Sequence, residues 1–160
     1  MTTEPPLRRL IRRYAQPGEV MWIGARPARR APIAELDRAE ITHAGLAEDH
    51  LPRPGKRAVT LIQWEHLLAI AALAGRETVT PDLLRRNVAV AGFNLAALRG
   101  REFRPGTALL KGTGPCAPCS RMEEALGQGG YAAMRGHGGF AAEVIEQGAV
   151  GLGDALTQLD

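Results

Sequence analysis

Short apolar stretches separated by glycine and proline run along most of the chain. Their length, and the turn-forming residues between them, are typical of β-strands. The pattern predicts strands over residues 19–24, 33–41, 58–62, 87–91, 107–110, 140–145 and 155–159. Strands this short and frequent do not alternate regularly with helices. We therefore predict a mainly β fold of the α+β class, with a barrel-like, mostly antiparallel core and a few peripheral helices.

Helical periodicity is limited to a few segments. Residues 63–74 are rich in Leu and Ala and are followed by Gly75, which predicts a helix with a glycine cap. A Thr-Pro pair predicts the start of a short helix over residues 80–84. Residues 120–126 read as a further helix, with two glutamates in its first turn.

The first 18 residues predict a separate basic amphipathic helix packed on a single domain that spans residues 19–160. Apolar residues recur at helical spacing between Leu7 and Tyr14, and arginines are concentrated in the first thirty residues. A basic helix can bind an anionic partner such as nucleic acid. We favour a solvated outer face and expect no nucleic acid, because aromatic residues make up only 4% of the chain and do not interleave with these arginines.

Composition places the chain among ordinary globular proteins. Its 160 residues suffice for one domain with its own core, and 45% of them are hydrophobic and 23% charged. No apolar run approaches the roughly 18 residues of a membrane span, and the N-terminus lacks the apolar region of a signal peptide. We therefore expect a cytoplasmic protein that contacts no membrane and keeps its thiols reduced. Abundant Ala, and Arg in place of Lys, suggest a GC-rich bacterial genome.

The segment with the most chemistry is the Cys-Ala-Pro-Cys motif, which holds the two cysteines, Cys116 and Cys119, beside Arg121. A thiolate is the reactive form of cysteine, and its pKa falls near cations, at helix N-termini and in C-x-x-C pairs. The motif alone does not fix a function, because redox pairs, zinc sites and single metal-binding thiolates all contain it.

Three interpretations of the motif stay open at this point. A thioredoxin-like site has the same strand, loop and helix, but residues 120–160 contain no proline to stand opposite a disulfide. A zinc site could use Cys116, Cys119, His137 and one further ligand, although the histidines are scattered. Two buried, inert cysteines are the third interpretation, and the flanking Gly114, Pro115 and Pro118 argue against it because they predict a loop.

Taken together in order, several segments resemble the MOSC domain, the module found at the C-terminus of molybdenum cofactor sulfurases. The resemblance extends from about Glu19 to Asp160. The segments that carry it are residues 45–50, 57–62, 85–95, 100–106, 114–122, 135–140 and 148–154. Membership implies a mixed β-barrel, in agreement with the strand pattern.

The resemblance also implies a site. In members that reduce N-hydroxylated compounds, such as the amidoxime-reducing proteins, a cysteine of this loop ligates the molybdenum of a pyranopterin cofactor. By motif position that ligand resembles Cys119. A soft thiolate suits this metal. An Arg two residues before an Asn helps hold the cofactor in the family, and these positions resemble Arg85 and Asn87.

Further residues are expected at or near the mouth of the same pocket. Asp49, His50 and Arg57 are the candidates, with Asp49 and His50 as a proton relay or as part of a hydrogen-bonded turn. His137, between glycines, is expected to be a neighbour of the site.

Two functions of different classes follow. The first is a molybdenum-cofactor enzyme that reduces N-hydroxylated small molecules, with electrons from a separate reductase because the chain has no flavin or iron–sulfur motif. The second is a non-catalytic carrier of sulfur or cofactor, in which Cys119 accepts persulfide sulfur from a donor protein and Cys116 resolves it.

Overall fold

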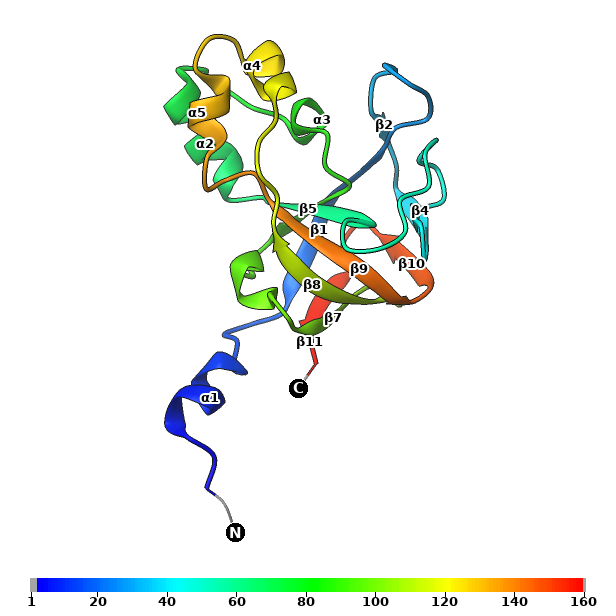
Figure 1. Cartoon of the computed structure of the whole chain (residues 1–160), viewed down its shortest axis with the longest axis vertical. Helices are drawn as coiled ribbons and strands as arrows, with labels where there is room; N and C mark the ends of the chain where they lie inside the picture. The colour runs from blue at the N-terminus through cyan, green and yellow to red at the C-terminus, as the bar shows by residue number, and fades with distance from the viewer. Residues whose placement is uncertain (1–2, 160) are drawn as a thin grey trace.

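A closed barrel forms the centre of the molecule (Figure 1). In the computed structural model, which describes residues 3–159, seven strands pair in the order β11-β7-β8-β9-β5-β6-β1, and β1 returns to β11 to close the ring. The strands are β1 (Gly18–Ala25), β5 (Val59–Gln63), β6 (Val88–Ala91), β7 (Glu102–Pro105), β8 (Leu109–Pro115), β9 (Phe140–Glu146) and β11 (Ala155–Gln158). In this barrel β5 and β6 are parallel, and all other neighbouring strands are antiparallel. The predicted mixed, mostly antiparallel barrel is confirmed.

A smaller sheet lies beside the barrel. It has the order β10-β3-β4, from β10 (Gly148–Gly151), β3 (Arg38–Thr42) and β4 (Gly45–Leu46). A two-residue strand, β2 (Ala34–Glu35), pairs with the end of β1. The single strand predicted over residues 33–41 is therefore two strands, because the chain leaves β1 at Leu36 and joins the smaller sheet at Arg38.

Two hydrophobic clusters stabilise this architecture. The barrel interior is filled by side chains such as Ile23, Leu61, Phe103 and Leu110, all fully buried. Burial of a side chain of this size contributes about 1.5–3 kcal/mol, so the barrel is the main source of stability. A second cluster lies between the outside of the barrel and the helices. Its members are Trp22, Ile62, Leu67, Ile70, Ala71, Val79, Leu84, Ala89, Met122, Leu126 and Met134.

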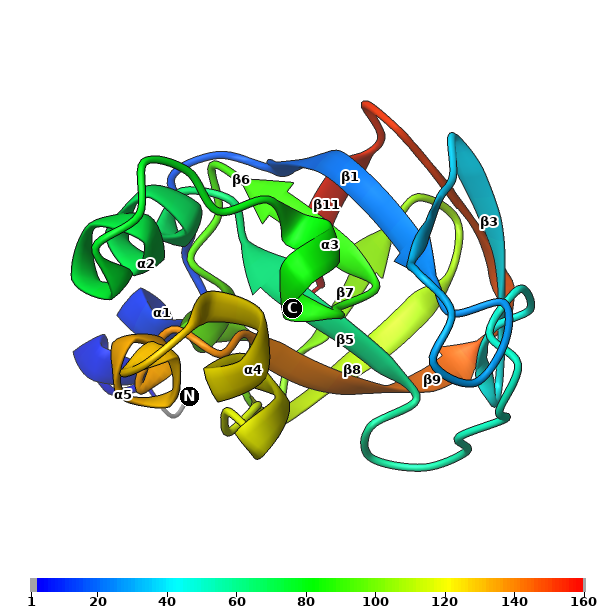
Figure 2. The ribbon, with the colours of Figure 1, turned by 90° about the horizontal axis from the view of Figure 1, so that it is seen from above.

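Four short helices gather over one end of the barrel, and the chain termini lie toward the other (Figures 1 and 2). They are α2 (His66–Ala74), α3 (Pro81–Leu84), α4 (Ser120–Leu126) and α5 (Gly130–Met134), and a 3-10 helix, η1 (Leu95–Leu98), follows β6. Helix α2 begins three residues later than predicted because β5 continues through Gln63. It ends at Gly75 in the left-handed conformation, as the glycine cap predicts.

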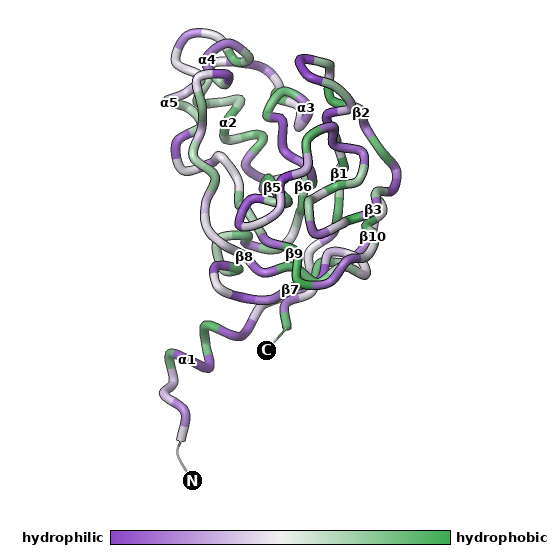
Figure 3. Tube along the Cα trace, turned by 45° about the vertical axis from the view of Figure 1, so that its right-hand side comes forward, coloured by the Kyte–Doolittle hydropathy of each residue, from purple (hydrophilic) through white to green (hydrophobic). Residues whose placement is uncertain are grey.

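The N-terminal helix, α1 (Pro6–Ile11), extends away from the barrel and has no buried residue (Figure 3). The expectation that it packs on the domain is therefore not met. Its connection to the barrel is held by Tyr14, whose ring centroid lies 5.5 Å from that of Phe93, and by Gln16, whose Nε2 donates to the Gly92 carbonyl at 3.1 Å. The apolar side chains of α1 are exposed, so the amphipathic pattern does not report burial here.

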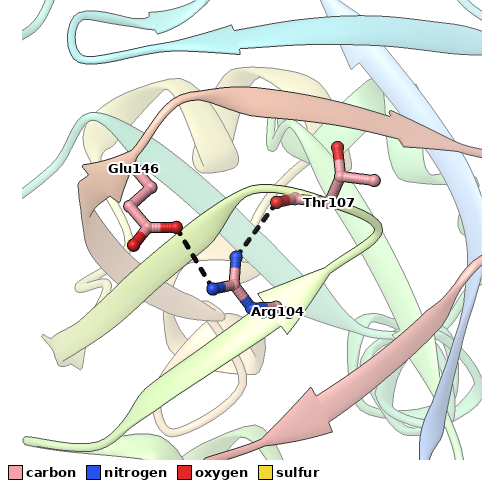
Figure 4. Close-up of polar contacts among 3 residues, drawn as sticks. All are labelled: Arg104, Thr107 and Glu146. Atoms are coloured by element: carbon pink, nitrogen blue, oxygen red, sulfur yellow. Dashed lines mark hydrogen bonds and ion pairs between the residues drawn. The ribbon is translucent and has the colours of Figure 1, made fainter.

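A polar clasp fixes the hairpin that leads into the cysteine motif (Figure 4). Arg104 on β7 donates through Nη1 to the Thr107 carbonyl and through Nη2 to Glu146 on β9, both at 3.1 Å. It thereby joins the turn before β8 to the end of β9. The strand that follows this turn, β8, ends at Pro115, directly before the cysteine motif.

No helix in the described range is long and apolar enough to cross a membrane.

Candidate functional site

The cysteine motif lies between the end of β8 and the start of α4. Its first cysteine is held in the core: Cys116 is buried, and its amide donates to the Gly139 carbonyl at 2.9 Å. Cys119 is exposed and precedes α4 as its N-cap residue, with no capping hydrogen bond from its side chain. The argument that flanking glycine and proline keep both thiols out of the core is thus wrong for Cys116, because β8 reaches Pro115 and carries the next residue inside.

A glycine-rich loop, residues 136–139, packs against the cysteine motif. A β-carbon at Gly138 would come within 2.3 Å of the Cys116 carbonyl oxygen, so this position has room only for glycine. Arg86 fixes the same loop, since its buried guanidinium donates from Nε to the Gly138 carbonyl at 2.7 Å and from Nη1 to the Leu84 carbonyl at 3.2 Å. Burial of a charged guanidinium is costly unless it is hydrogen-bonded, and the two carbonyl oxygens supply these bonds to Arg86.

The same arginine acts on the buried thiol. Burial raises the pKa of Cys116, and the nearby charges of Arg86 and Arg57 oppose that rise. Arg57, expected at the mouth of the pocket, is exposed and lies near Arg86 and Cys116.

Asn87 is at the centre of a buried hydrogen-bond network. Its Oδ1 accepts from the amide and the hydroxyl of Thr60, at 3.1 and 3.3 Å. Its Nδ2 donates to the Gly24 carbonyl at 3.2 Å and to Oδ2 of Asp49 at 3.1 Å. All four hydrogen-bonding positions of the amide are therefore used within the protein. Asn87 joins three strands and positions Asp49, and it has no free group for a cofactor.

Asp49 and His50 form a hydrogen-bonded turn that fixes the end of β1. Oδ1 of Asp49 accepts from the Arg26 amide at 2.7 Å, and the amide of His50 donates to the Arg26 carbonyl at 2.8 Å. The ring Nδ1 of His50 lies 3.0 Å from that carbonyl. The hydrogen-bonded turn expected for this pair is therefore present, and the proton relay stays a prediction.

Beyond this turn, arginine side chains converge. Burial lowers the pKa of Arg26, and the charges of Arg53, Arg85 and Arg121 lower it further, whereas Asp49 raises it. These groups come from four separate segments of the chain and remain charged. Asp49 is the one carboxylate that acts on Arg26 among these guanidinium groups, and their excess of positive charge attracts an anion.

Arg85 has two further properties of a functional residue. Its backbone is left-handed, with a φ of 57°, and its half-buried side chain has a buried Nε without a hydrogen-bond partner. Burial lowers the pKa of Arg85, as does Arg121, and Cys119 opposes this effect. The charges of Arg121 and Cys119 therefore both act on Arg85.

A cavity of about 760 Å³ opens at this point, between α3, α4 and the loop before β2. It is lined by Arg30, Pro32, Ile33, Asp82, Leu83, Arg85, Ser120, Arg121, Glu124 and Ala125. Arg30 and Arg85 are the two non-glycine residues with positive φ in the part of the chain that the structure describes, and both line this cavity. Such strain costs about 1–3 kcal/mol per residue and is concentrated at functional sites.

The alternatives for the cysteine motif lose their basis in this geometry. Within residues 3–159 no three His, Cys, Asp or Glu side chains gather as metal ligands, and His137 contacts His66 rather than the cysteines. A closed barrel also differs from the open sheet of a thioredoxin.

The family now follows from the sequence as a whole. The sequence model of the family described as MOSC domain matches residues 38–157. The chain belongs to the MOSC domain family. MOSC domains are associated in general with binding of the molybdenum cofactor.

Solved structures show the same fold for this MOSC domain. The YUAD protein from Bacillus subtilis superposes with a TM-score of 0.76 at 20% identity, covering 88% of this chain and 94% of that one. YiiM from Escherichia coli gives 0.72 at 21% identity, covering 91% and 71%. YiiM from Geobacillus stearothermophilus gives 0.72 at 18% identity, covering 90% and 76%. A search of curated protein sequences finds no match.

The residues of this MOSC domain fit a molybdenum cofactor. Cys119 offers an exposed, soft sulfur ligand, and Arg85, whose buried Nε has no hydrogen-bond partner, lines the neighbouring cavity. Phosphate accepts forked hydrogen bonds from guanidinium groups, and Arg121 supplies a second such group beside Arg85.

Sequence reasoning named Cys119 and Arg85 as candidates, but it did not name Arg26, Arg30 and Arg121, which the structure places near Arg85 or at the same cavity. The position of Arg121 two residues after Cys119 was a usable signal. Arg26 and Arg30 were not distinguishable in sequence from the arginines of α1.

Proposed function

We propose that this MOSC domain binds a molybdenum cofactor through Cys119 and reduces N-hydroxylated small molecules. The observation that carries the proposal is the exposed Cys119 thiol at the start of α4, next to a cavity of about 760 Å³ that is lined by Arg85, Ser120 and Arg121. The volume is that of a ligand-binding site rather than a packing defect.

Each residue has a defined task in this proposal. The Cys119 thiolate is the metal ligand, and Arg85 and Arg121 hold the anionic end of the cofactor. Asp49 and Asn87 act indirectly: they fix the backbone of Arg26 and the strand after Arg85, and so keep the arginines in place.

The bound cofactor would supply two electrons for cleavage of an N–O bond. With two protons, the hydroxylated nitrogen becomes N–H and the oxygen leaves as water, and the electrons come from a separate reductase protein. Asp82 and Glu124 line the cavity and are the carboxyl groups available to hold a basic substrate or to pass a proton.

Persulfide transfer is the second candidate, favoured by the exposure of Cys119. Its resolving partner is poorly suited, because burial raises the pKa of Cys116 and keeps that thiol protonated. A carrier would also need no cluster of arginines beside its thiol.

Reduction of an amidoxime, with reduced methyl viologen as electron donor, tests the proposal on protein from a host that makes the cofactor. Arg85→Gly is the informative variant, because glycine adopts the left-handed backbone without strain while the guanidinium is removed with the rest of the side chain. We expect it to lose activity while its thermal stability is unchanged or higher. Arg29→Gly, at an exposed position that does not line the cavity, should keep both.

Unchanged amidoxime reduction in Arg85→Gly or in Cys119→Ser would overturn the proposal. No amidoxime reduction by the wild type, together with sulfur transfer from a persulfide donor that is lost in Cys119→Ser and retained in Arg85→Gly, would establish the carrier instead.

A further inference from the structure

A pair of histidines lies outside the site described so far. His66 is the first residue of α2, and His137 lies in the glycine-rich loop after α5. Their rings meet at 90° with centroids 4.8 Å apart, and the two Nδ1 atoms are 3.3 Å apart. Both side chains are half-buried.

The separation of these nitrogens matches the spacing of ligands on a metal ion. A tetrahedral zinc ion with Zn–N distances of about 2.0–2.1 Å holds two nitrogen ligands about 3.3–3.4 Å apart. Imidazole is a ligand that suits zinc, copper and nickel. We propose that His66 and His137 form a two-histidine site for a divalent transition-metal ion such as Zn²⁺.

The surroundings of His66 favour its neutral ring, the form that binds metals. Burial lowers the pKa of His66, and His137 lowers it further, whereas Glu65 raises it. Neutral rings can both carry their proton on Nε2, which leaves the two facing Nδ1 lone pairs free for one ion. Glu65 itself is not a further ligand, because its carboxylate accepts from the Gly92 amide at 2.8 Å and from Nε2 of Gln63 at 3.0 Å.

One histidine of the pair, His66, lines a cavity. A space of about 260 Å³ is lined by His66, Asn94, Arg99 and Gly136, among other residues. It has room for the water molecules that would complete a tetrahedral shell. Because no third His, Cys, Asp or Glu joins the pair in the described range, the site is open rather than closed.

Metal at this position would join α2 to the loop that supports the cysteine motif. The Gly138 and Gly139 carbonyls of that loop accept from Arg86 and from the Cys116 amide. An ion on His137 would therefore restrict the loop below Cys116, without contact with the cavity beside Cys119.

Nitrogen-15 NMR of the histidine side chains, with Zn²⁺ alone added to the full chain, tests the site. The expected result is a large shift of Nδ1 in His66 and His137. His43 and His50 are internal controls, because their Nδ1 atoms face the backbone carbonyls of Val144 and Arg26 and should not shift. No shift of the pair at saturating Zn²⁺ would overturn the proposal.

Calorimetric titration adds a second readout in the Cys119→Ser background, which removes the exposed thiol as a competing ligand. Loss of even an outer partner typically weakens metal affinity by 10–100-fold, so His137→Gln should bind Zn²⁺ at least about tenfold more weakly than His43→Gln. Affinities within about twofold of each other would contradict the assignment. If His137→Gln fails to fold, the NMR result on the unsubstituted chain still decides.

Discussion

Replacement of Asn87 by alanine tests the largest structural claim about the site. The change removes four hydrogen bonds, to the Thr60 amide and hydroxyl, the Gly24 carbonyl and the Asp49 carboxylate. At least two of the abandoned groups, the Thr60 amide and the Gly24 carbonyl, belong to buried backbone. A buried polar group left without a partner costs about 1–3 kcal/mol, so the free energy of unfolding should fall by about 3–5 kcal/mol.

Urea denaturation followed by circular dichroism measures this loss. The matched control is Asn94→Ala, because Asn94 is exposed and accepts one capping hydrogen bond, from the Ala96 amide at 3.2 Å. Loss of such a cap costs about 1 kcal/mol. If Asn87→Ala is no more destabilising than Asn94→Ala, the network does not hold the strands as described. The variant Asn87→Asp sharpens the test, because it places a second carboxylate against Asp49 and should recover stability as the pH falls.

Three further predictions concern the cysteine loop and the helices around it. Gly138→Ala should displace the cysteine loop and lower the melting temperature, because the new β-carbon meets the Cys116 carbonyl oxygen at 2.3 Å; Gly151→Ala, with its nearest contact at 3.6 Å, should leave it unchanged. Iodoacetamide should label Cys119 in the folded protein and Cys116 only after unfolding, as peptide mass mapping would show, since burial raises the pKa of the Cys116 thiol. Hydrogen bonds from the amides of Tyr131 and Gly129 lower the pKa of Glu123. The contribution of the Glu123 carboxylate to stability is therefore complete above the ordinary glutamate pKa of about 4.3 and disappears as the pH falls through the lowered value. The difference in stability between wild type and Glu123→Gln should vanish in acid.

The strand positions could be predicted where a buried strand is a continuous apolar segment of the sequence. β5 and β9 are short apolar runs between turns, and both were found. β7 and β10 were missed, because β7 is half polar and ends at Pro105, and β10 begins and ends with glycine. Closure of the barrel between β1 and β11 depends on a pairing across the length of the chain, which no local pattern reports.

The candidate site was partly predictable for a similar reason. Cys119 was recognisable from its motif, and Arg85 from its position before Asn87. The two neighbouring arginines lie in different environments, however. Arg86 is buried and donates to the loop beside the cysteine motif, whereas Arg85 lines the cavity with a left-handed backbone. That difference arises from the left-handed backbone of Arg85 at the end of α3. Two adjacent arginines in a sequence do not indicate which of them adopts this conformation.

Asn87 shows how a residue at the right position can have a different task. Its residue type suits a cofactor edge, but each of its hydrogen-bonding atoms already has a partner from β1, β5 or the loop before β5. Substitution of Asn87 should therefore affect cofactor binding only through the stability and position of Asp49.

The most direct test of the central claim is the molybdenum and pterin content of the purified protein, from a host that makes the cofactor, for wild type beside Cys119→Ser. We expect molybdenum and pterin to co-purify with the wild-type chain and the molybdenum to be lost in the variant, whose fold should be unchanged because Cys119 is exposed. Equal molybdenum in both proteins, or none in the wild type, would contradict ligation of a molybdenum cofactor by Cys119.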